Sequence, residues 1–262
     1  MPERYAVSNR QDEIYYEHMQ RYVFAQRFAK DRKILDVACG SGYGSYFLAA
    51  NGAQHVDGVD ISKKAISHCH LHYHKDNLTF NVMDGVSLKL TDNSFDMVVS
   101  FETIEHIRQP DLFLSELKRV LKPDGILIIS TPNKAIYGLL GGDAHDFHVK
   151  EFLLDEFKEL LNKFFDVRNL YGQKRSEYYD KKIIEYEKKT KEKAQTNIFL
   201  KSNPLKLKNL IPDRIRRYLS GKITGLVVRS PEVSSFEDLV ISEVGIEESK
   251  FFLAIATPRI NI

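Results

Sequence analysis

LDVACGSGYGS, residues 35–45, joins an apolar segment to a helical one through a turn rich in glycine. Gly40, Gly42 and Gly44 occupy alternate positions, where they let the backbone turn tightly and approach a ligand with no Cβ in the way. A turn between a strand and a helix also presents amide N–H groups at the helix start. Residues 35–45 therefore predict a strand–turn–helix unit whose turn holds a ligand.

Strands and helices alternate along the rest of the chain. Apolar runs typical of buried strands occupy residues 33–38, 55–60, 78–83, 95–101, 126–131, 165–170 and 251–257. Helical patterns occupy residues 43–51, 62–74, 110–121 and 151–164, with Ser62 as a predicted N-cap. Residues 123–125 predict a turn. Repeated strand–helix units with right-handed crossovers form a doubly wound sheet, whose ligand crevice lies outside the C-terminal strand ends. We therefore expect an α/β, Rossmann-like, mostly parallel sheet of seven strands.

The chain is long enough for one α/β domain. It has 262 residues, of which 43% are hydrophobic, and we expect a single domain over residues 1–262. Residues 1–30 predict an N-terminal cap helix, because apolar side chains in residues 11–30 recur at mostly helical spacing. Residues 173–235 predict a basic, partly helical insertion or lid before the last strand.

Positive charge is concentrated in that insertion. Residues 174–229 carry 16 basic and 6 acidic side chains, against 22 and 30 in the rest of the chain. Residues 205–219 place apolar side chains largely on one side of a predicted helix, with lysine and arginine beside them. Such a helix can contact an anionic membrane, a phosphate-bearing acceptor or a second subunit of a homodimer, or fold onto its own domain. The sequence leaves these alternatives open.

Composition argues against several classes of protein. The N-terminal residues are polar, and no apolar run approaches the roughly 18 residues of a membrane-spanning helix. Cys39 and Cys69 lack the spacing of a metal cluster or a disulfide framework, so we expect no metal site. The lysine-rich run lacks interleaved base-stacking aromatic residues, which argues against specific nucleic-acid recognition. We expect a cytoplasmic protein, with peripheral contact to the inner membrane as an open alternative.

Acidic residues follow the predicted strands. Asp60 ends the second strand, 20 residues beyond Gly40, where a carboxylate can accept both hydroxyls of a ribose. This much fits NAD as well as S-adenosylmethionine (SAM). Ser45 stands where a dinucleotide site has its third glycine, and Asp36 lies in the strand ahead of the turn, where it can organise the turn and attract a cationic ligand. Asp84 ends the third strand and can accept from an adenine amine. Together these residues favour SAM.

Residues 33–133 resemble the class I SAM-dependent methyltransferases. The motifs are, in order, ILDVACGSGYG, VDGVDIS, NVMDG, SFDMVVSFETIEHI and VLKPDGILIISTPN. The resemblance implies a cofactor pocket lined by Asp36, Ala38, Cys39, Gly40, Gly42, Asp60, Ile61, Asp84, Gly85 and Phe101. It also implies that Arg21 lies on the helix that caps the cofactor, where this side chain meets the SAM carboxylate or is simply solvated.

Residues for catalysis are expected after the fourth and fifth strands. SAM carries an activated methyl group, so a methyltransferase mainly aligns a nucleophile and, for a hydroxyl acceptor, removes a proton. FETIEHI contains Glu102 and His106, and HDFHVKEF contains His148. We expect these three to be catalytic, with a histidine as base, although packing and capping roles for the histidines stay open. Four further histidines on one predicted helix are expected to be solvated: His68, His70, His72 and His74.

The acceptor is suggested only by the resemblance. FETIEH, then STPN, then H-x-x-E-F is similar to methyltransferases of bacterial cell-surface polysaccharide and sugar biosynthesis. That similarity implies O-methylation of a sugar or glycan, nucleotide- or lipid-linked. A quinone or other small lipid-like acceptor, a non-catalytic SAM-binding protein and a nicotinamide-dependent oxidoreductase are the alternatives.

Overall fold

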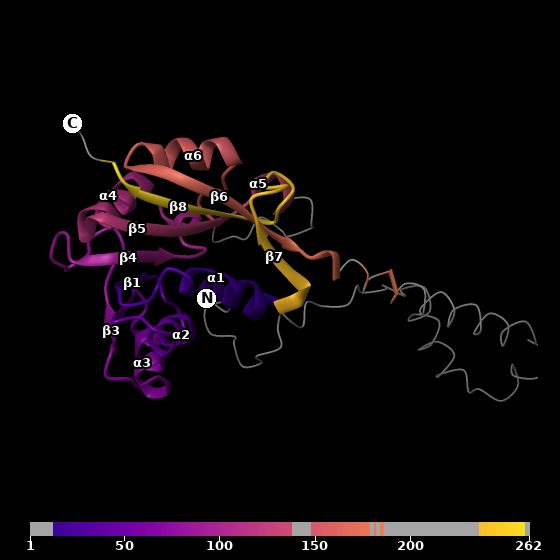
Figure 1. Ribbon diagram of the computed structural model, residues 1–262. Helices are drawn as coiled ribbons and strands as arrows, with labels where there is room; N and C mark the ends of the chain where they lie inside the picture. Colours follow the sequence, from indigo (N-terminus) through magenta and orange to yellow (C-terminus); the bar gives the residue numbers. More distant parts are fainter. Residues whose placement is uncertain (1–12, 138–147, 179–180, 182–183, 186–235, 260–262) are drawn as a thin grey trace, which may run out of the picture.

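The computed structural model describes residues 13–137, 148–178, 181, 184–185 and 236–259. A single sheet forms its centre, with the strand order β3-β2-β1-β4-β5-β8-β6-β7 (Figure 1). The strands are β1 (Lys33–Val37), β2 (His55–Asp60), β3 (Leu78–Val82), β4 (Phe95–Ser100), β5 (Leu121–Pro132), β6 (Phe165–Arg175), β7 (Leu239–Ser242) and β8 (Phe251–Pro258). The α-helices are α1 (Glu13–Gln26), α2 (Tyr43–Ala50), α3 (Lys63–His72), α4 (Pro110–Val120), α5 (Lys134–Tyr137) and α6 (Leu154–Asn162).

The parallel part of the sheet is the part that the sequence predicts best. β1 pairs in parallel with β2 and β4, β2 with β3, and β4 with β5. β8 lies antiparallel between β5 and β6. All seven predicted strands are present, which confirms the Rossmann-like, mostly parallel α/β sheet.

Two differences from the prediction concern the antiparallel edge and β5. β7 is an eighth strand, and it pairs with residues 172–175 of β6, most of which the charge pattern assigns to the insertion. Its four residues are too few for a clear alternation of apolar and polar side chains. β5 includes residues 123–125, where the sequence predicts a turn, and its register with β4 shifts between Phe95 and Met97.

Apolar side chains cover both faces of the sheet, as parallel strands require. On one face, Leu35 of β1 belongs to a buried cluster with Phe113 of α4 and Phe157 of α6. On the other, Ile34 packs in a second cluster with Leu48 of α2 and with side chains of α1 and α3. Helices α1 to α3 accordingly lie on one side of the sheet and α4 and α6 on the other (Figure 1).

Local signals explain where several helices begin and end. The Ser62 hydroxyl accepts a hydrogen bond from the Ala65 N–H at 3.3 Å, which confirms the predicted N-cap of α3. Pro110 occupies the first turn of α4, where its missing N–H costs nothing. Gly52 follows α2 with φ 103°, a conformation that favours glycine.

Part of the predicted architecture lies outside the described residues. This holds for residues 186–235, the larger part of the predicted insertion, and so for the predicted helix at residues 205–219. Within the described part of the chain, no helix is both long and apolar enough to cross a membrane.

Helix α1 packs closely on the start of α2 through Tyr22. The Tyr22 ring meets the Phe101 ring edge-on, with 5.0 Å between ring centroids. A Cβ built on Gly44 would overlap the Tyr22 ring, so the third glycine of the turn makes room for α1.

Gly44→Ala should therefore destabilise the fold. Overpacking against a buried ring costs about 1–3 kcal/mol, more than the ~1 kcal/mol by which alanine favours a helix over glycine. Urea unfolding of the two proteins measures the difference.

The control is the same substitution in a Tyr22→Ala background. Without the ring, Gly44→Ala should be neutral or stabilising, since only the helix propensity remains. Equal destabilisation in both backgrounds would contradict the role of Tyr22.

Candidate active site

The turn after β1 contains three residues with left-handed backbone. Ala38 has φ 62°, Gly40 φ 57° and Gly42 φ 83°. A Cβ on Gly42 would lie 2.6 Å from Cys69 Sγ, whereas a Cβ on Gly40 would meet nothing within 4 Å. Packing therefore explains Gly42, and Gly40 lies beside open space where a ligand can approach the backbone. Cys39 is buried between them.

Asp60 links this turn to the next strand–helix junction. One carboxylate oxygen accepts from the Gly40 N–H at 3.0 Å, and the other from the Ser62 N–H at 2.8 Å. Each carboxylate oxygen can accept a further hydrogen bond, so the group is fixed in place and keeps capacity for a ligand. Ile61, next along the chain, is 59% exposed at the same edge.

Asp36 lies behind the turn and is fully buried. Its carboxylate accepts from the Ser45 hydroxyl at 2.6 Å and from the Tyr22 hydroxyl at 3.1 Å. The pKa of Asp36 is raised from 3.8 to about 7, because burial and, to a smaller extent, the nearby Asp60 charge outweigh the two hydrogen bonds, which lower it. Ser45, which replaces the third glycine of a dinucleotide site, thus holds Asp36. Of the two predicted functions of Asp36, these contacts support the organisation of the turn.

The third strand brings Asp84 and Gly85 to the same edge. The register pairs Val37 with Val59 and Asp60 with Val82, so the C-terminal ends of β1, β2 and β3 lie next to one another. Asp84 is exposed, and its carboxylate accepts from the backbone two residues on at 3.1 Å. The predicted cofactor residues of these strands therefore gather at one edge of the sheet.

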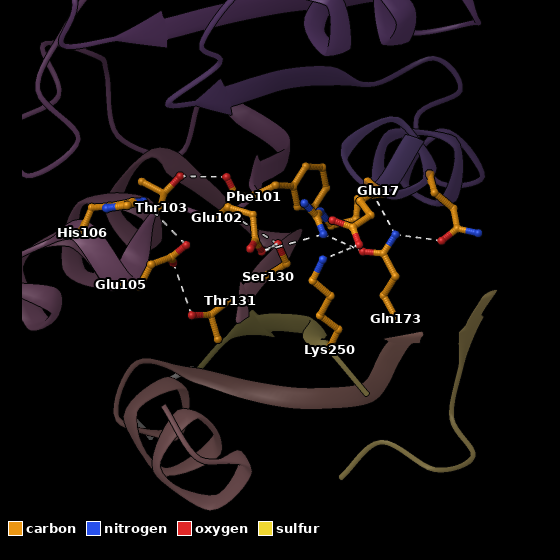
Figure 2. Close-up of polar contacts among 12 residues, drawn as sticks. Glu17, Phe101, Glu102, Thr103, Glu105, His106, Ser130, Thr131, Gln173 and Lys250 are labelled. Carbon is orange, nitrogen blue, oxygen red and sulfur yellow. Dashed lines mark hydrogen bonds and ion pairs between the residues drawn. The ribbon is translucent and has the colours of Figure 1, made fainter. Parts of the chain in front are cut away.

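Glu102 follows β4 in a strained conformation. Its φ is 52°, which is uncommon for a residue other than glycine and marks a position held by its surroundings. Ser130 of β5 donates its hydroxyl to Glu102 Oε1 at 2.7 Å and accepts from the Glu102 N–H at 3.3 Å (Figure 2). Phe101, just before it, is buried against Tyr22.

Arg21 of α1 points inward toward Glu102. The two side chains approach to 3.9 Å, and Arg21 Nη1 donates to Gln173 Oε1 at 2.5 Å. Arg21 is fully buried, so the alternative of a solvated arginine is wrong. Its Nε and Nη2 find no hydrogen-bond partner among the described residues, and its contact with the SAM carboxylate stays a prediction.

Polar contacts anchor α1 to the antiparallel half of the sheet (Figure 2). Lys250 Nζ and Glu17 Oε1 form an ion pair at 2.7 Å. Gln173 Nε2 donates to the Glu17 carbonyl at 2.9 Å and to Gln20 Oε1 at 2.8 Å. Nothing in the sequence pattern singles out Gln173, because its partners lie about 150 residues earlier in the chain.

Glu105, His106 and His148 lie together beyond the end of β4. The 3-10 helix η2 (Ile104–His106) supplies the first two, and the rings of His106 and His148 are 4.9 Å apart. Glu151 Oε1 lies 2.8 Å from His148 Nδ1. Glu105 accepts from the Thr131 hydroxyl at 3.3 Å; burial and then the Glu102 charge raise the pKa of Glu105 well above its ordinary value.

The backbone explains why two segments far apart in sequence meet there. The Glu105 carbonyl accepts from the N–H groups of Val149 and Lys150 at 2.8 and 3.1 Å. His148 is thereby held beside η2, next to His106. Among the four histidines predicted to be solvated, His70 and His72 of α3 and His74 just beyond it are exposed, whereas His68 of α3 is half-buried.

Comparison with known proteins agrees with this geometry. Residues 35–129 match the model of a family described as Methyltransferase domain. A Mycolicibacterium smegmatis protein named as an S-adenosylmethionine-dependent methyltransferase is 34% identical over 154 residues, which are 58% of this chain and 56% of that protein. A Pelagibacter ubique ubiquinone biosynthesis O-methyltransferase is 35% identical over 108 residues, 41% of this chain and 45% of that protein. A Triticum aestivum phosphoethanolamine N-methyltransferase is 40% identical over 102 residues, 38% and 20% of the two chains.

Solved structures share the fold at low identity. A chain from a Haloferax volcanii complex of a methyltransferase activator with a methyltransferase has a TM-score of 0.60 at 16% identity, and covers 94% of this chain and 91% of that one. The [4+2]-cyclase SpnF has a TM-score of 0.55 at 18% identity, with 94% and 82% covered. These likenesses show the Rossmann-like methyltransferase fold.

Residues 35–129 therefore match a methyltransferase family model, and relatives that align over this region are named as S-adenosylmethionine-dependent methyltransferases. The chain spans about half the length of the curated relatives it matches.

The buried Asp36 predicts a distinct pH dependence of stability. Between about pH 4 and about pH 7 the folded protein holds the Asp36 proton while the unfolded chain releases it, so its contribution to the free energy of unfolding falls as pH rises. Replacing Asp36 by Asn removes this contribution. Relative to wild type, the free energy of unfolding of Asp36→Asn should rise by up to about 3 kcal/mol between about pH 5 and about pH 8, measured by urea unfolding.

Asp96→Asn is the matched control. Asp96 has a lowered pKa despite partial burial, because Lys122 and the Lys33 N–H bond its carboxylate. The stability that ionised Asp96 contributes is lost only in acid. The effect of Asp96→Asn on the free energy of unfolding should therefore not change between about pH 5 and about pH 8. A pH-independent effect of Asp36→Asn would contradict the raised pKa.

Proposed function

We propose that this chain transfers the methyl group of SAM to a hydroxyl group of a small-molecule acceptor. The observation that carries the proposal is the open glycine turn at Gly40, bonded to the Asp60 carboxylate at the tip of the neighbouring strand. Both features suit bound SAM, because its ribose hydroxyls can donate to a carboxylate and its methionine part can pass close to the backbone of the turn.

The residues at the strand ends fit SAM in shape and charge. The open face of Gly40 has room for the ligand, and Asp60 keeps acceptor capacity for the ribose. Asp84 is exposed at the neighbouring strand end, where it can accept from the adenine amine. In this proposal the pocket comprises Asp36, Ala38, Cys39, Gly40, Gly42, Asp60, Ile61, Asp84, Gly85 and Phe101, with Arg21 at the methionine carboxylate.

Glu102, His106 and His148 are the proposed catalytic residues. The S–CH₃ bond of SAM breaks as the acceptor O–CH₃ bond forms, and S-adenosylhomocysteine leaves. The acceptor proton passes to an imidazole, which titrates near neutral pH. Glu151, whose Oε1 lies 2.8 Å from His148 Nδ1, orients that ring.

For the acceptor we propose a hydroxyl group of a nucleotide- or lipid-linked sugar or glycan. The support is the similarity of the FETIEH and STPN motifs to methyltransferases of bacterial cell-surface polysaccharide and sugar biosynthesis. A quinone-type acceptor is the second candidate, because the ubiquinone biosynthesis O-methyltransferases are among the relatives. Transfer of labelled methyl groups from SAM to separate pools of nucleotide sugars, lipid-linked glycans and quinone precursors discriminates between them. Label in the quinone pool alone rules out the sugar acceptor.

A SAM-binding protein without methyl transfer is a further candidate, because SpnF shows that this fold also serves a cyclase. That candidate predicts SAM binding with no label in any acceptor pool. A nicotinamide-dependent oxidoreductase predicts NAD binding without SAM binding.

The basic insertion, residues 173–235, bears on partners and location. We propose that it contacts an anionic surface, a phosphate-bearing acceptor or the inner membrane, in a cytoplasmic protein; a homodimer contact is the alternative. Co-sedimentation with anionic liposomes, wild type against charge reversal of Arg214, Arg216 and Arg217, tests the membrane version. Equal lack of binding eliminates it.

Asp60→Ala should weaken SAM binding. Loss of a hydrogen bond to a charged group costs about 1.5–3 kcal/mol, and about 1.4 kcal/mol is tenfold in affinity. We therefore expect Kd for SAM and for S-adenosylhomocysteine to rise by at least about tenfold in calorimetry.

Asp124→Ala serves as control. Asp124 is exposed near the opposite end of β5, so its removal should leave Kd for SAM unchanged. If Asp60→Ala binds SAM as tightly as Asp124→Ala does, the assignment of the ribose to Asp60 is wrong.

A further inference from the structure

Glu105, His106 and His148 form a cluster of metal-ligand type. One ligand atom from each lies within 4.8 Å of the others. We propose that these three side chains bind a divalent transition-metal ion, of the type of Zn²⁺, at the acceptor side of the site. No cysteine or histidine spacing predicts such a site, since its ligands lie on two segments that meet only in the fold.

Glu105 carries the main physical reason for a cation. The side chain is fully buried, and Oε1 has no hydrogen-bond partner among the described residues. The other oxygen accepts from Thr131, so the carboxylate is oriented and half satisfied (Figure 2). A buried polar atom without a partner destabilises the folded protein, and more so when it is charged. A metal ion at Oε1 would remove that cost.

The distances fit a metal after small movements. Zn²⁺ binds imidazole nitrogen and carboxylate oxygen at about 2.0–2.2 Å, which puts neighbouring ligand atoms about 3–4 Å apart. Glu105 Oε1 and His106 Nε2 are 3.9 Å apart. All three ligand atoms lie within 4.8 Å of one another, so the cluster needs to contract by about 1 Å to reach these separations.

Glu151 supplies the outer contact of a metal-bound histidine. Its carboxylate lies 2.8 Å from His148 Nδ1, so Nε2 is the ligand atom that His148 offers. Carboxylate–histidine–metal arrangements orient the ring and increase its basicity as a ligand. Two imidazoles and one carboxylate suit Zn²⁺ and neighbouring transition metals, whereas Mg²⁺ prefers oxygen ligands throughout.

Three protein ligands leave a position for an exogenous oxygen, as in catalytic zinc sites. This step rests on the proposed function. An acceptor hydroxyl bound there has a lowered pKa; it releases its proton to water, and its oxygen forms the bond to the methyl group as the S–CH₃ bond breaks. With the metal bound, His106 and His148 act as ligands, and the acceptor class narrows to compounds that present an oxygen ligand to the ion.

The test is titration of the full-length, untagged, chelator-treated protein with Co²⁺, followed by visible absorption, and with Zn²⁺ in calorimetry. We expect one equivalent to bind, with d–d bands of four- or five-coordinate Co²⁺. His148→Gln and Glu105→Gln should each weaken binding by at least about tenfold, as loss of even an outer contact does. Glu105→Gln keeps the shape of the buried side chain, so circular dichroism and urea unfolding show whether the fold is intact.

His72→Gln is the matched control. His72 is exposed and stacks on His68 with 4.0 Å between ring centroids, so this pair is the obvious site for adventitious metal. Binding that is lost in His72→Gln and kept in His148→Gln overturns the proposal, as does no binding of one equivalent to wild type.

Calorimetry with SAM on the same samples separates the two proposals. SAM binding without metal binding refutes the metal site alone. Failure to bind SAM refutes the proposed function, whatever the metal titration shows.

Discussion

The Asp60 carboxylate, held between two backbone N–H groups, is the interaction on which the candidate site depends. One N–H comes from the glycine turn after β1 and the other from the start of α3. The two strand–helix junctions are therefore locked together before any ligand arrives. Behind them, Asp36 ties Ser45 of α2 to Tyr22 of α1 in a buried contact. A cofactor that binds at this edge meets groups already in position, which is how binding avoids the entropy of ordering them.

The antiparallel half of the sheet extends this preorganisation to the acceptor side. Lys250 and Gln173 hold α1 over the sheet through Glu17, and the same helix brings buried Arg21 toward Glu102. Ser130 of β5 holds the strained Glu102 in turn. The predicted cofactor residues after the parallel strands and the predicted catalytic residue Glu102 after β4 are therefore linked by one network of contacts. A substitution in α1 should therefore alter the surroundings of both Asp36 and Glu102.

Much of the parallel half could be predicted from sequence because its signals are local. The glycine turn, the apolar runs and the Ser62 cap each act within a few residues, and each is confirmed. The β7 strand and the contacts of Gln173 could not, because pairing partners lie far along the chain. The same holds for the catalytic candidates. The sequence predicts His106 and His148 as separate candidates, but only the fold shows that their ring centroids lie 4.9 Å apart. No sequence pattern predicts that Glu105 is buried with one carboxylate oxygen lacking a hydrogen-bond partner among the described residues.

A crystal structure of the chain soaked with SAM tests the central claim most directly. The account predicts the ribose hydroxyls within hydrogen-bond distance of Asp60 and the methionine part of the ligand over the open face of Gly40. An empty crevice in crystals soaked with excess SAM, or a ligand bound away from the ends of β1 and β2, would contradict it.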